Sequence, residues 1–209
     1  MIKGIASDLD GTLLDSTELI ARAWEEALSS EGLPADYYGI LKRTKGISSK
    51  DIIKMYKENA GPEDIKRIKD KRRKNFLRLL EDRRDILYPE TINVIRKVKE
   101  RGIKFAIATG LSRDLLDHVL DVTGLSSIVD CSISADDVSR GKPEPDIFLE
   151  AFRRLNVDPK EGLVIGDSEN DIIPGKKIGA FTVFISREGG KLDIADADIS
   201  NLEELFKFL

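Results

Sequence analysis

The sequence has 209 residues, a length that suits one sizeable domain or a core with an insertion. Hydrophobic residues make up 41% and charged residues 34% of it. The formal net charge of −4 gives no global attraction to nucleic acid or to an anionic membrane, and we expect neither as a partner. Cys131 is the single cysteine, which excludes an internal disulfide, and no long apolar segment or signal-like start occurs. We therefore expect a cytoplasmic protein, and nothing in the sequence specifies its oligomeric state.

The first part of the chain predicts one strand followed by helices. An apolar run over residues 2–7 predicts a strand that ends in an acidic turn. Apolar residues at three- and four-residue spacings then predict a helix closed by Gly32, a second that ends near Gly61, and a long charged third over residues 63–81. The stretch 39–46 is short and basic, and no strand pattern occurs between residues 15 and 85.

From Ile86 onward strands and helices alternate. Strands are predicted over residues 103–108, 128–133, 163–165 and 181–185, with helices between them and a closing helix over 201–209. This alternation predicts an α/β fold, a Rossmann-like parallel sheet with helices on both faces. The core would comprise residues 1–15 and 86–209. The all-helical segment 16–85 is too long for a loop, and we interpret it as an inserted helical cap with hinges near 15–17 and 85–88.

The turn after the first strand carries the first candidate site residues. Asp8 and Asp10 lie at the carboxyl end of the strand, the edge at which open α/β sheets bind ligands. Two neighbouring carboxylates repel each other unless they share a proton or bind a cation. Gly11 allows a sharp turn, and Thr12 offers a hydroxyl that can bond back to it. A polar turn without function is the alternative explanation.

Later strand ends bring complementary groups to the same edge. Thr109 offers a hydroxyl and Gly110 opens a helix, which together suit an anion. Lys142 lies in a proline-stiffened loop before a helix that Asp146 can cap, and Asp167 directly follows an apolar strand. Carboxylates are the hard oxygen ligands that suit Mg²⁺, and the hydroxyl, amides and ammonium suit a phosphate. These groups together indicate phosphoryl transfer.

Four ordered motifs give the sequence a family resemblance. They are Asp8-Leu9-Asp10-Gly11-Thr12, Thr109-Gly110, Lys142-Pro143 and Gly166-Asp167-Ser168-x-x-Asp171. The chain resembles the haloacid dehalogenase-like hydrolase superfamily over essentially its whole length, and within it the phosphoglycolate phosphatases and their relatives. The segment Gly110-Leu111-Ser112-Arg113 departs from the small polar residues that relatives more often carry there.

The resemblance implies a role for each matched residue. Asp8 would be the nucleophile that forms an aspartyl-phosphate, and Asp10 would protonate the leaving alcohol and then activate water. Thr109 and Lys142 would hold the phosphate, with Gly110 beside them. Mg²⁺ would bind Asp8, Asp10 through its backbone carbonyl, and Asp167, with Asp171 supporting this shell.

The resemblance leaves a phosphatase and a mutase open. The expected activity is Mg²⁺-dependent hydrolysis of a small phosphorylated metabolite, similar to phosphoglycolate. A β-phosphoglucomutase-type phosphomutase is the alternative, because Arg43-Thr44-Lys45-Gly46-Ile47-Ser48 is similar to the cap loop with which mutases grip a sugar phosphate. Arg43 and Lys45 are therefore candidate substrate contacts, and a basic surface turn is the competing interpretation of this loop.

Overall fold

The computed structural model describes residues 1–43, 47–83 and 85–209 of the chain. It divides into two compact units. The first, Met1–Asp15 with Leu87–Leu209, contains the sheet and is called the sheet unit below. The second, Ser16–Ile86, is called the helical unit.

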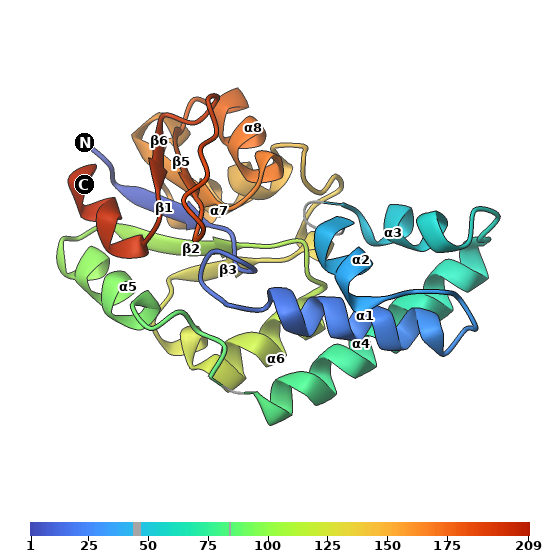
Figure 1. The fold of residues 1–209 in the computed structure, drawn as a ribbon. Helices are drawn as coiled ribbons and strands as arrows, with labels where there is room; N and C mark the ends of the chain where they lie inside the picture. Colours follow the sequence, from blue (N-terminus) through green and yellow to red (C-terminus); the bar gives the residue numbers. More distant parts are fainter. Residues whose placement is uncertain (44–46, 84) are drawn as a thin grey trace. The chain divides into compact units, whose positions relative to one another are not determined.

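The sheet unit is built on a parallel sheet of six strands in the order β3-β2-β1-β4-β5-β6 (Figure 1). The strands are β1 (Gly4–Ser7), β2 (Lys104–Ala108), β3 (Cys131–Ile133), β4 (Gly162–Gly166), β5 (Phe181–Ile185) and β6 (Ala197–Ile199). Every pair of neighbours runs parallel, and β1 lies between β2 and β4. The predicted Rossmann-like sheet is confirmed.

Helices cover both faces of this sheet. They are α5 (Thr91–Glu100), α6 (Arg113–Thr123), α7 (Asp146–Leu155) and α8 (Glu169–Lys177). The chain builds outward from β1 to β2 and β3, then crosses back to β4 and continues to β5. Because such crossovers are right-handed, this reversal places α5 and α6 on one face and α7 and α8 on the other, as Figure 1 shows. Phe148 and Phe152 of α7 pack on the small residues Ala6 and Ala106 of the central strands.

The helical unit contains α1 (Thr17–Ser29), α2 (Tyr37–Arg43), α3 (Ser49–Tyr56) and α4 (Pro62–Asp82). Trp24 lies in its apolar core and is 2% exposed. Ion pairs from α4 add to this packing, since Arg67 and Lys71 both contact Glu31, just beyond α1. Among the described residues, no helix combines the length and apolar character needed to cross a membrane.

The structure differs from the predictions at five places. Helix α2 and strand β6 were not predicted. Strand β3 covers only the last half of the expected strand 128–133, because the amides of Ile128 and Val129 donate back to the Leu125 carbonyl of a 3₁₀ turn. The closing segment is a 3₁₀ helix, Leu202–Lys207, rather than an α-helix. Asp146 does not cap α7: Pro145 occupies the cap position, and Asp146 pairs with Arg140.

Candidate active site

Asp8 lies at the point where the sheet reverses its direction of growth. It directly follows β1, and its amide donates to the Ile165 carbonyl of β4 at 2.8 Å. The connections that leave β1 and β4 lead to helices on opposite faces, which opens a crevice between their carboxyl ends. Asp167 directly follows β4, so the two predicted carboxylates flank this crevice.

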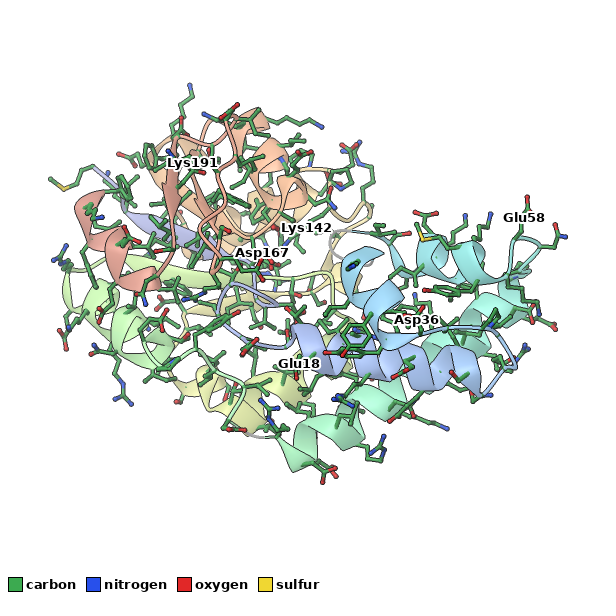
Figure 2. The ribbon with its side chains drawn as sticks, in the orientation of Figure 1. Glu18, Asp36, Glu58, Lys142, Asp167 and Lys191 are labelled. Atoms are coloured by element: carbon green, nitrogen blue, oxygen red, sulfur yellow. The ribbon has the colours of Figure 1, made fainter. Side chains whose placement is uncertain are left out.

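Lys142 reaches the same position from the loop before α7. Its ammonium lies 2.5 Å from Asp8 Oδ1 and 2.6 Å from Asp171 Oδ1, and it donates to the Ala108 carbonyl at 2.9 Å. The Lys142 side chain is 11% exposed, and its bond to Pro143 is cis. Figure 2 shows Lys142 and Asp167 approaching this end of the sheet from separate segments.

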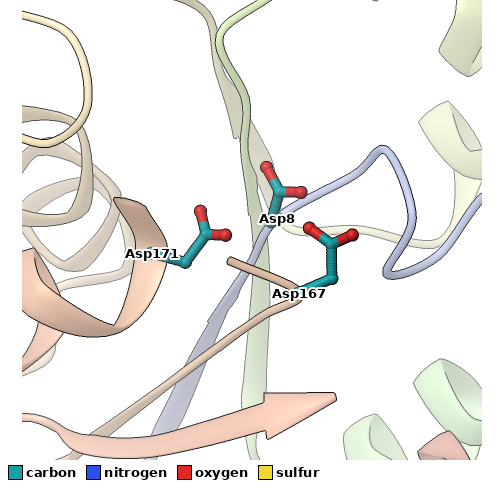
Figure 3. Close-up of side chains that lie close together, drawn as sticks. All are labelled: Asp8, Asp167 and Asp171. Atoms are coloured by element: carbon teal, nitrogen blue, oxygen red, sulfur yellow. The ribbon is translucent and has the colours of Figure 1, made fainter. Parts of the chain in front are cut away.

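Three carboxylates converge here. Asp8, Asp167 and Asp171 each offer an oxygen, and these oxygens all lie within 4.8 Å of one another (Figure 3). Asp171, in the first turn of α8, accepts a hydrogen bond from Ser168 Oγ at 2.7 Å through its second oxygen. The three come from two loops and one helix start, so only the fold brings them together.

The electrostatics of this cluster are those of a site with excess negative charge. Burial raises the pKa of Asp8 well above its usual value, and Asp171 and Asp167 raise it further, while Lys142 opposes the shift. Burial alone would lower the pKa of Lys142, but the negative charges of Asp171 and Asp8 hold it above its usual value. A divalent cation bound by these hard oxygen donors would offset the remaining repulsion. The residues present therefore fit Mg²⁺.

Two glycines make this convergence possible. Gly11 has φ +78°, and a Cβ there would lie 2.3 Å from Asp167 Oδ2. A Cβ on Gly166 would lie 2.3 Å from both Cβ and Cγ of Asp171. Any side chain at either position would displace a carboxylate of the cluster.

The predicted phosphate-binding residues follow β2 at the same edge. Thr109 is buried, its amide donates to the Ile133 carbonyl at 3.0 Å, and its hydroxyl accepts from the amide of Leu111 at 3.3 Å. Gly110 is exposed. The unusual Arg113 that follows belongs to a different cluster: its guanidinium pairs with Asp137 and donates to the carbonyl of Ser132 at 2.9 Å.

The remaining predicted residues are placed less fully. Asp10 lies in the loop after β1 and forms an isolated bridge with Leu14. Arg43 ends α2, and its side chain, like the whole of Lys45, lies outside the described residues.

The ion pair between Lys142 and Asp171 was not predicted. The spacing of Asp167 and Asp171, four residues apart at a helix start, was the available signal. It could not reveal that Asp171 turns to Lys142, because that contact depends on the path of the loop 139–145.

The match to a family model decides the family. Residues 2–179 match the model described as haloacid dehalogenase-like hydrolase. The chain belongs to this family. The haloacid dehalogenase-like fold and hydrolase class that the four motifs predicted are thereby confirmed, as is the expectation of an enzyme.

Relatives from this hydrolase family extend along nearly the whole chain. A phosphoglycolate phosphatase of Aquifex aeolicus is 28% identical, over 98% of this chain and 95% of the relative. The structure of CbbY from Rhodobacter sphaeroides in complex with phosphate superposes with a TM-score of 0.85 at 26% identity, covering 98% and 96% of the two chains. A β-phosphoglucomutase from Clostridium difficile shares the fold, with a TM-score of 0.85, 24% identity, and 100% and 95% coverage.

Proposed function

We propose that the protein is a Mg²⁺-dependent phosphatase that hydrolyses a small phosphomonoester through an aspartyl-phosphate. The observation that carries this proposal is the ammonium of Lys142, 2.5 Å from Asp8 within a cluster of three carboxylates. An ammonium there screens a nucleophilic carboxylate from an incoming phosphate. The names of the Aquifex aeolicus phosphatase and of the phosphate-bound CbbY structure agree with this chemistry.

In the first half of the reaction, a carboxylate oxygen of Asp8 attacks the phosphorus atom. The bond between phosphorus and the ester oxygen breaks as the new bond forms. Asp10, entering as a carboxylic acid, gives its proton to that leaving oxygen, so the alcohol departs neutral.

In the second half, Asp10 acts as the base. Its carboxylate accepts a proton from water, and the water oxygen attacks the phosphorus of the aspartyl-phosphate. The Asp8 carboxylate leaves, inorganic phosphate is released, and Asp10 again carries the proton for the next turnover.

The surrounding residues bind and orient the phosphate. The hydroxyl of Thr109, the amide of Gly110 and the ammonium of Lys142 offer hydrogen-bond donors to its oxygens. The carboxylates of Asp8 and Asp167 and the backbone carbonyl of Asp10 would hold Mg²⁺. When bound, this ion supplies positive charge against the carboxylates and the phosphate oxygens.

The helical unit has a proposed role in choosing the substrate. We infer that it acts as a cap that closes over the phosphate and excludes water, with Arg43 and Lys45 contacting the organic part of an anionic substrate. Its linkers leave the sheet unit directly after Asp15 and return at Leu87.

The test is phosphate release from a panel of phosphomonoesters, with Mg²⁺ and with EDTA. The panel includes phosphoglycolate and β-glucose 1-phosphate, with glucose 6-phosphate followed in parallel. Mg²⁺-dependent phosphate release is expected. Glucose 6-phosphate formation without net phosphate release would replace the phosphatase by the mutase, and no reaction of any ester would refute both.

Two variants test the assigned roles against a matched control. Asp8→Asn is expected to abolish turnover, and near-normal rates would contradict the aspartyl-phosphate. Asp10→Asn is expected to lower kcat about 10²- to 10⁴-fold on alkyl phosphates but less on p-nitrophenyl phosphate, whose leaving group needs little protonation. Equal losses on both substrates would contradict the acid role. Asp121→Asn, on the exposed side of α6, should leave both rates unchanged.

A further inference from the structure

Arg187 makes three contacts that no sequence motif predicted. It lies just after β5, and its side chain is 20% exposed. One guanidinium nitrogen pairs with Glu90, and the other donates to the backbone carbonyl of Thr12 at 2.8 Å. The guanidinium carbon lies 3.6 Å from the centroid of the Tyr88 ring, in stacking contact. All four residues belong to the sheet unit.

These contacts converge on the loop that carries Asp8 and Asp10. Arg187 holds the carbonyl of Thr12, and the next carbonyl, that of Leu13, accepts from the Tyr88 amide at 3.1 Å and from Thr91 Oγ1 at 2.9 Å. The segment 88–91 thus supports the loop directly, and Arg187 ties that segment and the loop together.

Internal hydrogen bonds tie the loop together. The amides of Leu13 and Leu14 donate to the Leu9 carbonyl at 2.9 and 3.0 Å, and the Gly11 amide donates to the Leu14 carbonyl at 2.8 Å. Gly11 also packs so closely on Asp167 that no Cβ fits between them. A shift of Thr12 would therefore move the loop's carboxylates against Asp167.

The Glu90 carboxylate holds the guanidinium of Arg187 through their ion pair. Its side chain is 11% exposed, and it also accepts a long hydrogen bond from the Leu202 amide at 3.4 Å. Burial alone would raise the pKa of Glu90, but the hydrogen bond from Arg187 helps to bring it below its usual value. Glu90 therefore stays ionised and keeps the planar guanidinium oriented between Thr12 and the Tyr88 ring. A lysine could not make the same three contacts, because its ammonium is a point charge without a planar face to stack on the Tyr88 ring.

We propose that Arg187 is a positioning residue: by holding the Thr12 carbonyl, it sets the alignment of Asp8 and Asp10 with Asp167. The effect of Arg187 on the reaction rate rests on the proposed phosphatase function. Its role in holding the loop is independent of that function. Misplacement of reacting groups by about 1 Å costs on the order of 10²-fold in rate. Because Arg187 does not itself contact the phosphate in this scheme, its loss should lower kcat more than it raises KM.

The experiment compares Arg187→Met with Arg101→Met. Arg101 is a fair control because its guanidinium also stacks on an aromatic ring of the sheet unit, at 4.6 Å from the centroid of Phe206. Hydrogen exchange of peptides covering residues 9–15 is measured together with kcat and KM for p-nitrophenyl phosphate. We expect Arg187→Met to speed exchange in these peptides and to lower kcat about 10- to 100-fold, with KM changed less than about threefold. Arg101→Met should change neither, and Arg187→Lys should fall between Arg187→Met and the wild type.

A double variant separates positioning from stability. Arg187→Met leaves the Glu90 carboxylate without its partner, and adding Glu90→Gln removes that charge. The double variant should regain Tm while kcat stays low, and recovery of kcat together with Tm would overturn the inference. Unchanged exchange in residues 9–15 would overturn it as well. Faster exchange in a protein whose wild type hydrolyses no phosphomonoester would support the loop-holding role and refute the phosphatase.

Discussion

Replacing Lys142 by methionine tests the electrostatic account of the site. Methionine keeps much of the length of the side chain and removes its charge. The substitution leaves two buried carboxylates without their shared partner, since the side chains of Asp8 and Asp171 are 12% and 2% exposed. The carbonyl of Ala108 also loses its donor.

The expected cost follows from this burial. Removing one partner of a buried ion pair destabilises a protein by about 3–5 kcal/mol, and here the lost ammonium serves two carboxylates. Uptake of a proton by Asp8 limits the cost, because burial already raises the pKa of Asp8 and the variant removes the opposing effect of Lys142. The folded variant then binds a proton that the unfolded chain releases, so its stability falls as pH rises through the raised pKa.

Urea unfolding in EDTA at pH 5 and pH 8 measures this effect. We expect Lys142→Met to lose about 3–5 kcal/mol at pH 8 and clearly less at pH 5. Lys177→Met, an exposed lysine of α8, is the matched control and should stay within about 0.5 kcal/mol of the wild type at both pH values. A loss below about 1 kcal/mol at pH 8, or a larger loss at pH 5, would refute the account.

Two further substitutions test packing beside Asp171 and the charge of Asp137. Gly166→Ala forces a Cβ against Asp171, so we expect a loss of about 1–3 kcal/mol in urea unfolding. The control is Gly141→Ala, where a Cβ meets nothing within 4 Å, and it should be nearly neutral. Asp137→Asn should cost about 2 kcal/mol at pH 7. Partial burial opposes ionisation of Asp137, but hydrogen bonds from Ser134 and from Arg154 and Arg113 hold its pKa well below the usual range. That stabilisation is present above the unfolded pKa of 3.8 and is lost as pH falls, so the difference from wild type should shrink in acid, and a constant difference would contradict it.

The sequence predicted the sheet because its pattern is local and repeated. Each apolar run is followed by a helical pattern, and the crossover rules then leave few topologies. Strand β6 (Ala197–Ile199) escaped because three residues with an aspartate in the middle carry no strand signal. Helix α2 (Tyr37–Arg43) was not predicted because its seven residues, with Gly39 among them, carry little helical pattern. The Gly39 amide in fact lies in the first turn of α2 and donates to Oδ1 of Asp36, the residue before the helix, at 2.7 Å.

The candidate site was predictable to the extent that it follows strand ends. Asp8, Thr109 and Asp167 each directly follow an apolar run, and parallel strands bring such ends to one edge. Side-chain pairing was not predictable in this way. The contact between Arg187 and Thr12 joins residues 175 positions apart, and no periodicity or turn signal connects them.

The charge balance of the site implies that cation and phosphate bind together. With Asp8, Asp167 and Asp171 ionised, the ammonium of Lys142 leaves a net charge of −2 at the place proposed for a phosphate dianion. Negative charges that lie close together in a poorly solvated site repel each other strongly. Bound Mg²⁺ would cancel that charge, so Mg²⁺ and phosphate should each raise the other's affinity by the same factor. Calorimetric titration of inorganic phosphate with and without Mg²⁺ measures this factor, and equal phosphate affinity in EDTA would contradict the proposed place of the phosphate beside these carboxylates.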